Sequence, residues 1–140
     1  MKNSIVRDKS YAFALRVIRL ARWLREHKEY EMANQVLRAG TSIGANVEEA
    51  LAGISRADFA AKMSIASKEA RETHYWLRLL RDSKIIPSKK INPMLKEADE
   101  LIRILTAIVK TSQRSKIPEH SKLNTQNSKL GLASKGEPPK

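Results

Sequence analysis

The sequence predicts an all-α protein, an up-and-down antiparallel four-helix bundle. Apolar residues recur every three to four positions in four long segments, which is the period of an amphipathic helix. Short connections separate these segments, and short connections make consecutive helices antiparallel neighbours. No segment shows the alternation of apolar and polar residues that is typical of a strand.

The first helix is expected from about Lys9 to Lys28, with Asp8 or Ser10 as its cap and residues 1–8 as an N-terminal extension. Its apolar face consists of Phe13, Val17, Leu20, Ala21 and Leu24. The second helix is expected from about Glu31 to Leu51. Its apolar period runs through Gly40 and Gly44, which predicts a continuous helix that a neighbour approaches closely. A break at Gly44 is the alternative.

The third helix is expected to begin at Ser55, because Ser55 and Asp58 have capping-box spacing and Gly53 is a suitable stop for the helix before. Its apolar seam has heptad spacing and small residues in its middle: Phe59, Met63, Ala66, Ala70, Thr73, Leu77 and Leu80. The fourth helix is expected from Ile91 or Pro93 to Thr111, with Pro93 in its first turn.

The bundle is therefore predicted over residues 9–113, followed by a disordered basic tail over residues 114–140. In the tail, apolar periodicity is lost, and Ser, Lys, Asn, Gln, Gly and Pro dominate. The tail is interpreted either as a flexible nucleic-acid-binding arm or as a segment without a measurable role.

The charge balance points to an anionic partner. The chain carries +12, of which residues 114–140 contribute +4 and residues 1–113 contribute +8. A basic domain attracts phosphate backbones or anionic lipid surfaces, and the alternative is an ordinary solvated surface. The absence of cysteine excludes disulfides and thiolate metal sites. Because there is no signal-peptide pattern and no long apolar run, we expect a cytoplasmic protein.

Catalysis is not expected. The three histidines, His27, His74 and His120, lack the Glu-x-x-His spacing of metal centres in helical bundles. The sequence contains no phosphate-binding glycine loop and no nucleophile elbow. We therefore expect neither a cofactor nor a metal.

Two groups of residues are candidates for nucleic-acid binding. The third helix carries Lys68, Arg71, Tyr75 and Arg78 on the side opposite its apolar seam, where cations could neutralise phosphates and the ring could stack on a base. The alternative is a solvent face on which arginine packs over Tyr75. The first helix adds Arg19 and Arg22, which share its outer side with apolar residues and so also suggest an oligomer contact; these neighbours are Tyr11, Leu15 and Ile18.

Polar residues border two of the apolar faces. They are Ser42, Asn46 and Glu49 on the second helix, and Glu69, Glu72 and Trp76 on the third. Such residues form hydrogen bonds across an interhelical or intersubunit seam, so a structural role is predicted for them in preference to a binding pocket.

The run from Leu37 to Ala50 resembles the central motif of the bacterial four helix bundle protein family, approximately R-A-x-x-S-I-x-A-N-x-x-E-G. Arg38, Ser42, Asn46 and Glu49 match it, and Ala50 replaces the usual Gly. Residues 55–59 and 65–77 are similar to the family's third helix, and the resemblance spans about residues 9–110. The family includes proteins encoded by intervening sequences in bacterial large-subunit ribosomal RNA genes and the accessory variability determinant of diversity-generating retroelements.

The resemblance implies a ring-shaped homo-oligomer, typically a pentamer with a positively charged surface. In the retroelement branch the ring binds nucleic acid and a reverse transcriptase. For this chain we predict a non-enzymatic homo-oligomeric accessory protein that binds nucleic acid, with structured RNA favoured. The alternative is an oligomeric scaffold for an acidic partner protein, such as a reverse transcriptase or another enzyme encoded nearby. Membrane binding is not expected, because the apolar helix faces are used in the bundle.

Overall fold

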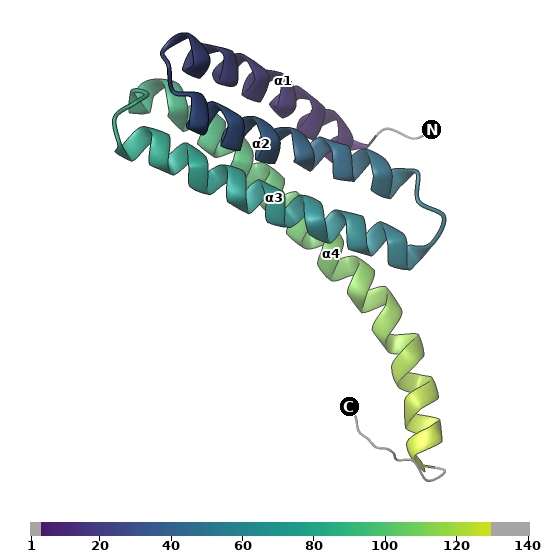
Figure 1. The fold of residues 1–140 in the computed structure, drawn as a ribbon. Coiled ribbons are helices and arrows are strands. Elements are labelled where there is room, and N and C mark those ends of the chain that lie inside the picture. The colour runs from purple at the N-terminus through teal and green to yellow at the C-terminus, as the bar shows by residue number, and fades with distance from the viewer. Residues whose placement is uncertain (1–3, 130–140) are drawn as a thin grey trace. The chain divides into compact units, whose positions relative to one another are not determined.

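The structure, a computed structural model, describes the backbone of residues 4–129 and the side chains of residues 4–114. This part of the chain contains four helices and no strand: α1 (Ile5–Glu26), α2 (Tyr30–Leu51), α3 (Arg56–Asp82) and α4 (Ser88–Lys129). Consecutive helices α1, α2 and α3 pack side by side in antiparallel order (Figure 1). Ion pairs and hydrogen bonds join α4 to α1 and to α3 within residues 88–109, which closes the predicted four-helix bundle.

The start of α1 differs from the prediction. The helix begins at Ile5, and its cap is Ser4, whose Oγ accepts a hydrogen bond from the Arg7 backbone nitrogen at 3.2 Å. The capping role given to Asp8 or Ser10 and the extension over residues 1–8 are therefore wrong from residue 4 onward, and residues 1–3 lie outside the described part. The reason is that Val6 and Ser10 are buried, so the inner face of α1 extends two turns before Phe13.

The start of α4 also lies earlier than predicted. The Pro87 carbonyl accepts hydrogen bonds from the backbone nitrogens of Lys90 and Ile91, at 2.9 and 3.1 Å, so the helix begins at Ser88. Pro93 is consequently in the second turn, and its first-turn assignment is wrong. The helix tolerates it there because the hydrogen bond it removes is the one to the carbonyl of Lys89, a solvent-exposed residue.

The end of α4 is the third difference. The helix continues to Lys129, where an end at Thr111 and a disordered tail from residue 114 were expected. Adding residues to an existing helix costs little, because each one contributes a hydrogen bond, and residues 114–129 contain no Gly and a single Pro. A composition that cannot build a core therefore does not by itself end a helix. Residues 110–129 belong to a second compact unit, and residues 130–140 lie outside the described part.

The predicted course of α2 and α3 is confirmed. The helix α2 continues through both glycines, so the break at Gly44 is wrong. A Cβ at Gly40 would lie 2.7 Å from both Cγ atoms of Val17 on α1, so no other residue allows this close approach, whereas a Cβ at Gly44 would make only ordinary contacts. Ser55 caps α3 by accepting a hydrogen bond from the Asp58 nitrogen at 3.0 Å.

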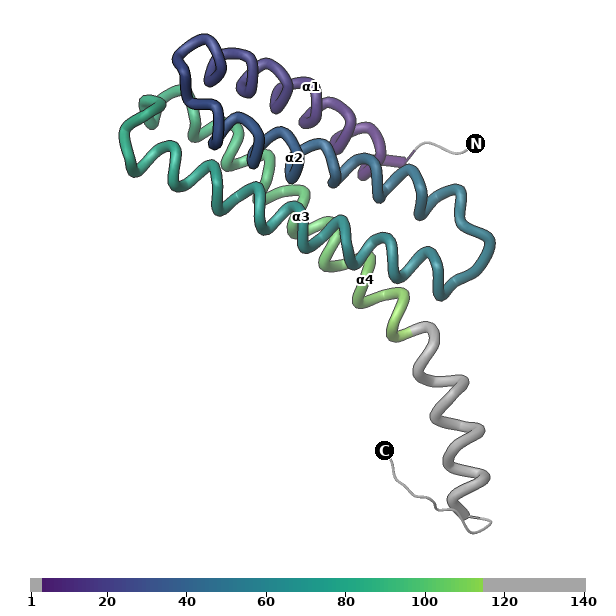
Figure 2. The backbone as a smooth tube through the Cα atoms, in the orientation of Figure 1, coloured from purple at the N-terminus to yellow at the C-terminus, as the bar shows by residue number. Residues whose placement is uncertain are grey.

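The connections between the helices are short and hydrogen-bonded (Figure 2). In the first of them Lys28 has a φ of 65°, and the Glu29 nitrogen donates to the Leu24 carbonyl at 2.8 Å. These features define a Schellman turn at the C-terminus of α1. Lys84 has the same φ after α3, where its nitrogen donates to the Arg81 carbonyl at 3.0 Å. Both turns reverse the chain, which produces the antiparallel order.

Candidate nucleic-acid interface

The predicted residues of α3 lie on its exposed side. Arg71 and Arg78 are the ones nearest to α4, whereas Lys68 lies one turn before Glu72, closer to the α2 side. Lys68, Arg71, Tyr75 and Arg78 are all exposed. Arg71 Nη2 donates to Thr106 Oγ1 of α4 at 3.1 Å, and the Arg78 guanidinium carbon lies 5.7 Å from the centroid of the Tyr75 ring. Among the residues whose side chains are described, no carboxylate pairs with any of these cations. Arg78 thus packs over Tyr75, which is the arrangement that the solvent-face alternative expected, and the cations of this side form no ion pair within the described part of the chain.

A histidine links this side of α3 to α4. Arg78 Nε donates to His74 Nδ1 at 3.0 Å, and His74 Nε2 lies 3.0 Å from Asp99 Oδ1. Because Nδ1 accepts, the neutral ring carries its proton on Nε2 and donates it to Asp99. Asp99, which faces this side of α3 from α4, is thus engaged by His74. Asp82 lies four residues after Arg78; its ion pair is with Arg81, and its pKa is lowered mainly by the hydrogen bond from Arg81, with smaller contributions from the charges of Arg81 and Arg78.

Two cations of α4 extend this surface, and the sequence analysis missed them. Arg103 lies four residues after Asp99 and three before Thr106, and Lys96 lies three residues before Asp99, so both share the side of α4 that meets α3. Both are exposed, and neither pairs with a carboxylate of the described residues. Their spacing of seven is the signal that could have found them. We call the combined surface the α3–α4 basic face: Lys68, Arg71, Tyr75, Arg78, Lys96 and Arg103.

The structure does not bring Arg19 and Arg22 into this face. Both are exposed on α1, whose neighbours are α2 and α4, whereas Arg71 and Arg78 are on α3. In an up-and-down bundle the first and third helices are diagonal, so residues on their outer sides point in different directions. The two groups of predicted nucleic-acid residues are therefore separate surfaces.

The opposite flank of α3 meets α2 through a paired charge cluster. Arg38 of α2 forms ion pairs with Glu72 and with Glu69, the latter at 3.4 Å. Glu72 also accepts a hydrogen bond from Trp76 Nε1 at 2.9 Å. The three residues predicted to be structural, Arg38, Glu69 and Glu72, thus come together in one cluster that joins two helices.

The remaining motif residues divide into two kinds. Ser42 Oγ donates to the Arg38 carbonyl at 2.6 Å, and Asn46 Nδ2 donates to the Ser42 carbonyl at 2.8 Å. Both side chains therefore bond within α2, whereas we expected bonds across a seam between helices or subunits. Short polar side chains commonly bond to the carbonyl one turn earlier in this way. Glu49 does reach α3, where it lies 2.8 Å from Lys62 Nζ, and its hydrogen bond and negative charge raise the pKa of Lys62.

The described residues offer neither a metal-binding cluster nor a membrane-spanning helix. They contain no group of three histidine or carboxylate side chains that could hold a metal ion. None of their helices is long and apolar enough to cross a membrane.

Comparisons with known proteins identify the chain's relatives. The model of the 23S rRNA-intervening sequence protein family matches residues 2–107. A crystal structure from Bacteroides thetaiotaomicron, described as a protein with unknown function from the S23 ribosomal protein family, is 45% identical and superimposes with a TM-score of 0.74. That match covers 76% of this chain and 99% of the other. No curated protein matches the chain. With a family model covering three quarters of its length, this chain belongs to the 23S rRNA-intervening sequence protein family.

Proposed function

We propose that this protein is a non-enzymatic, homo-oligomeric cytoplasmic accessory protein that binds structured RNA through the α3–α4 basic face. One observation carries the proposal: within residues 4–114 the cations of this face form no ion pair with a carboxylate, whereas those of the α2–α3 seam do. Unpaired cations gathered on one surface are the electrostatic footprint of a phosphate-binding protein. The family's name links its members to ribosomal RNA genes, which favours RNA over DNA.

The residues of this face could make three different kinds of contact with an RNA. Arg71 and Arg78 present planar guanidinium groups that can each make two hydrogen bonds to a phosphate. Lys68 on α3 and Lys96 and Arg103 on α4 would add positive charge on either side of the contact between these helices. The axes of packed helices lie about 8–10 Å apart. Tyr75 offers a half-exposed ring on which an unpaired base of an RNA loop could stack. Binding by phosphate neutralisation should depend weakly on sequence and strongly on salt.

The proposed self-association is supported by apolar side chains on α1. Tyr11 is 64% exposed and Leu15 is 43% exposed, on the outer side of the helix. Neighbouring apolar groups of this kind are common in contacts between subunits. Whether the assembly is the pentameric ring that the resemblance implies is part of the proposal.

Size-exclusion chromatography with light scattering, with and without an RNA hairpin, tests both parts of the proposal. At low salt we expect a discrete oligomer that co-elutes with the hairpin and releases it as the salt concentration rises. An oligomer that does not bind the hairpin even at low salt would contradict the RNA proposal. That result would favour the alternative function, an oligomeric scaffold whose basic face binds an acidic protein.

A further inference from the structure

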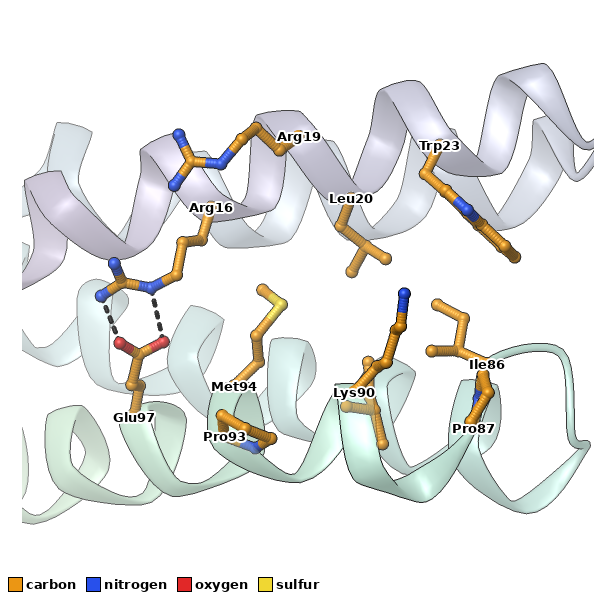
Figure 3. A pocket seen from close by; sticks show the side chains of 11 residues that line it. Arg16, Arg19, Leu20, Trp23, Ile86, Pro87, Lys90, Pro93, Met94 and Glu97 are labelled. Carbon is orange, nitrogen blue, oxygen red and sulfur yellow. Dashed lines mark hydrogen bonds and ion pairs between the residues drawn. The ribbon is translucent and has the colours of Figure 1, made fainter.

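A groove of about 730 Å³ lies between α1 and the first turns of α4. Figure 3 shows Leu20 and Trp23 of α1 facing Met94, Lys90 and Ile86 across it. Most of its lining is apolar, including two prolines, Pro87 and Pro93, that stiffen the α4 side. The volume is within the range of sites that bind small molecules, roughly 300–1,000 Å³.

The groove begins where the ion pairs between the two helices end. Lys9 Nζ lies 3.1 Å from Glu100 Oε2, and Arg16 Nε donates to Glu97 Oε1 at 2.7 Å. Arg16 and Glu97 form the end wall of the groove, where they neutralise each other (Figure 3). Beyond that wall, towards Trp23, most of the facing residues are apolar, and no ion pair joins α1 to α4 in the described part of the chain.

The Trp23 side chain is held in place before any ligand arrives. Its ring stacks on His27 with 3.8 Å between centroids, and His27 Nδ1 lies 2.8 Å from the Trp23 carbonyl. Trp23 is nevertheless 37% exposed. A fixed, half-exposed aromatic ring at the edge of an apolar groove supplies contact area at a low cost in side-chain entropy.

Two cations line the groove from opposite helices. Arg19 lies on the α1 side and Lys90 on the α4 side, and neither has a carboxylate partner among the described residues. Because Glu97 is engaged by Arg16, the groove combines apolar walls with two positive charges that form no ion pair with the side chains described. Its chemistry therefore complements a molecule with an apolar body and a negatively charged head.

We propose that this groove binds a small amphipathic carboxylate, one that carries a long aliphatic body. The body would displace water from Leu20, Trp23 and Met94, and the carboxylate would pair with Lys90. The guanidinium of Arg19 points towards Arg16 (Figure 3), so Arg19 would attract the anion through its charge. A nucleic acid is too polar to fill a groove with apolar walls. A second copy of this chain carries a net charge of +12, so it would neutralise the two cations less well than an anion does. The site shares no residue with the α3–α4 basic face, so it is independent of the proposed RNA binding.

Calorimetric titration of the full chain with three ligands of equal tail length tests the proposal. Dodecanoate and dodecyltrimethylammonium would be used below their critical micelle concentrations, and dodecanol below its solubility limit. We expect dodecanoate to bind once per subunit, dodecanol about tenfold more weakly because it lacks the charged hydrogen bonds, and the cation not to bind. Equal binding of all three ligands, or no saturable binding of dodecanoate, would overturn the proposal.

Two double variants distinguish the contribution of the carboxylate head group to affinity from that of the aliphatic tail. Arg19→Gln with Lys90→Gln should lower dodecanoate affinity to that of dodecanol and leave dodecanol unchanged. The matched control, Lys28→Gln with Lys89→Gln, removes the same charge from exposed positions that do not line the groove, and it should bind dodecanoate as the parent does. Equal losses in the two double variants would contradict a specific site.

A third variant tests the apolar wall and the main competing occupant. Trp23→Ala should weaken dodecanoate and dodecanol alike, while thermal unfolding followed by circular dichroism shows that the bundle is intact. Light scattering on the same variant must show the oligomeric state of the parent. If Trp23→Ala instead converts an oligomer into a monomer, the groove is a contact between copies of this chain and the proposal is wrong.

Discussion

The two flanks of α3 carry opposite charges, and only one flank forms ion pairs between its charges and the neighbouring helix. Towards α2, Glu69 and Glu72 pair with Arg38. Towards α4, Arg71 and Arg78 bond to neutral groups, a threonine hydroxyl and a histidine ring nitrogen. The comparison teaches that a net charge of +12 is not spread evenly over this protein, because one seam neutralises its cations and the other leaves them available.

This difference separates structural charges from candidate binding charges. Half-exposed ion pairs contribute little to stability, so the α2–α3 pairs mainly fix which side chains meet at the seam. Cations without an acidic partner repel one another. Binding of an anion relieves this repulsion, so these cations contribute to anion affinity rather than to folding. We therefore expect changes on the α2 flank to affect stability and changes on the α4 flank to affect RNA affinity.

The largest effect is expected when charge is reversed on the α4 flank. Arg71→Glu combined with Arg78→Glu should lower the affinity for an RNA hairpin at low salt by roughly a hundredfold, because it removes two phosphate contacts and adds repulsion. Fluorescence anisotropy measures the affinity, and circular dichroism should show unchanged helicity. A matched control, Arg56→Glu with Lys28→Glu, reverses two exposed charges outside the face and should lose far less affinity. Unchanged RNA affinity in the first variant would contradict the proposed face.

Removing the aromatic ring of the same flank should have a smaller and more selective effect. Tyr75→Ala should weaken binding to a hairpin with an unpaired loop by about 1 kcal/mol, since stacking of a base on the ring is lost. A fully paired RNA duplex should bind as before. Parallel titrations with the two RNAs measure the difference, and an equal loss for both would rule out a stacking role.

The smallest effect is expected on the α2 flank. Arg38→Ala should lower the free energy of unfolding by about 1 kcal/mol or less, because the pair is half-exposed and Glu69 and Glu72 are left facing each other. Urea unfolding measures this change. RNA affinity should stay within twofold to threefold of the parent, as expected for the loss of one charge outside the face. If the substitution weakens the free energy of RNA binding by more than it lowers the free energy of unfolding, the two flanks are not distinct.

Much of the fold could be predicted because every helix buries one continuous stripe. Phe13, Val17 and Leu24 repeat with a helical period that no other structure accommodates, and they are fully buried. The ends of the helices were less predictable. Ser4 is the cap because Val6 continues the buried face, which depends on tertiary packing, and α4 continues to Lys129 although the apolar period of the sequence is lost from residue 114.

The candidate site was predictable only in part. Spacing along α3 predicts that Lys68, Arg71 and Arg78 share a side, but it does not indicate what faces them. That depends on the rotation of α4, which places Thr106 and Asp99 against α3 and thereby Arg103 beside them. The position of the groove likewise depends on where α1 and α4 diverge, and the sequence of one helix alone does not determine that.

One paired measurement tests the central claim most directly: the RNA affinity of two double variants that each remove two positive charges. Arg71→Gln with Arg78→Gln changes the flank towards α4, and Arg38→Gln with Lys62→Gln changes the flank towards α2. The account predicts a loss of about tenfold or more for the first variant and little change for the second. Equal losses would show that RNA responds only to net charge, and the α3–α4 basic face would not be a binding site.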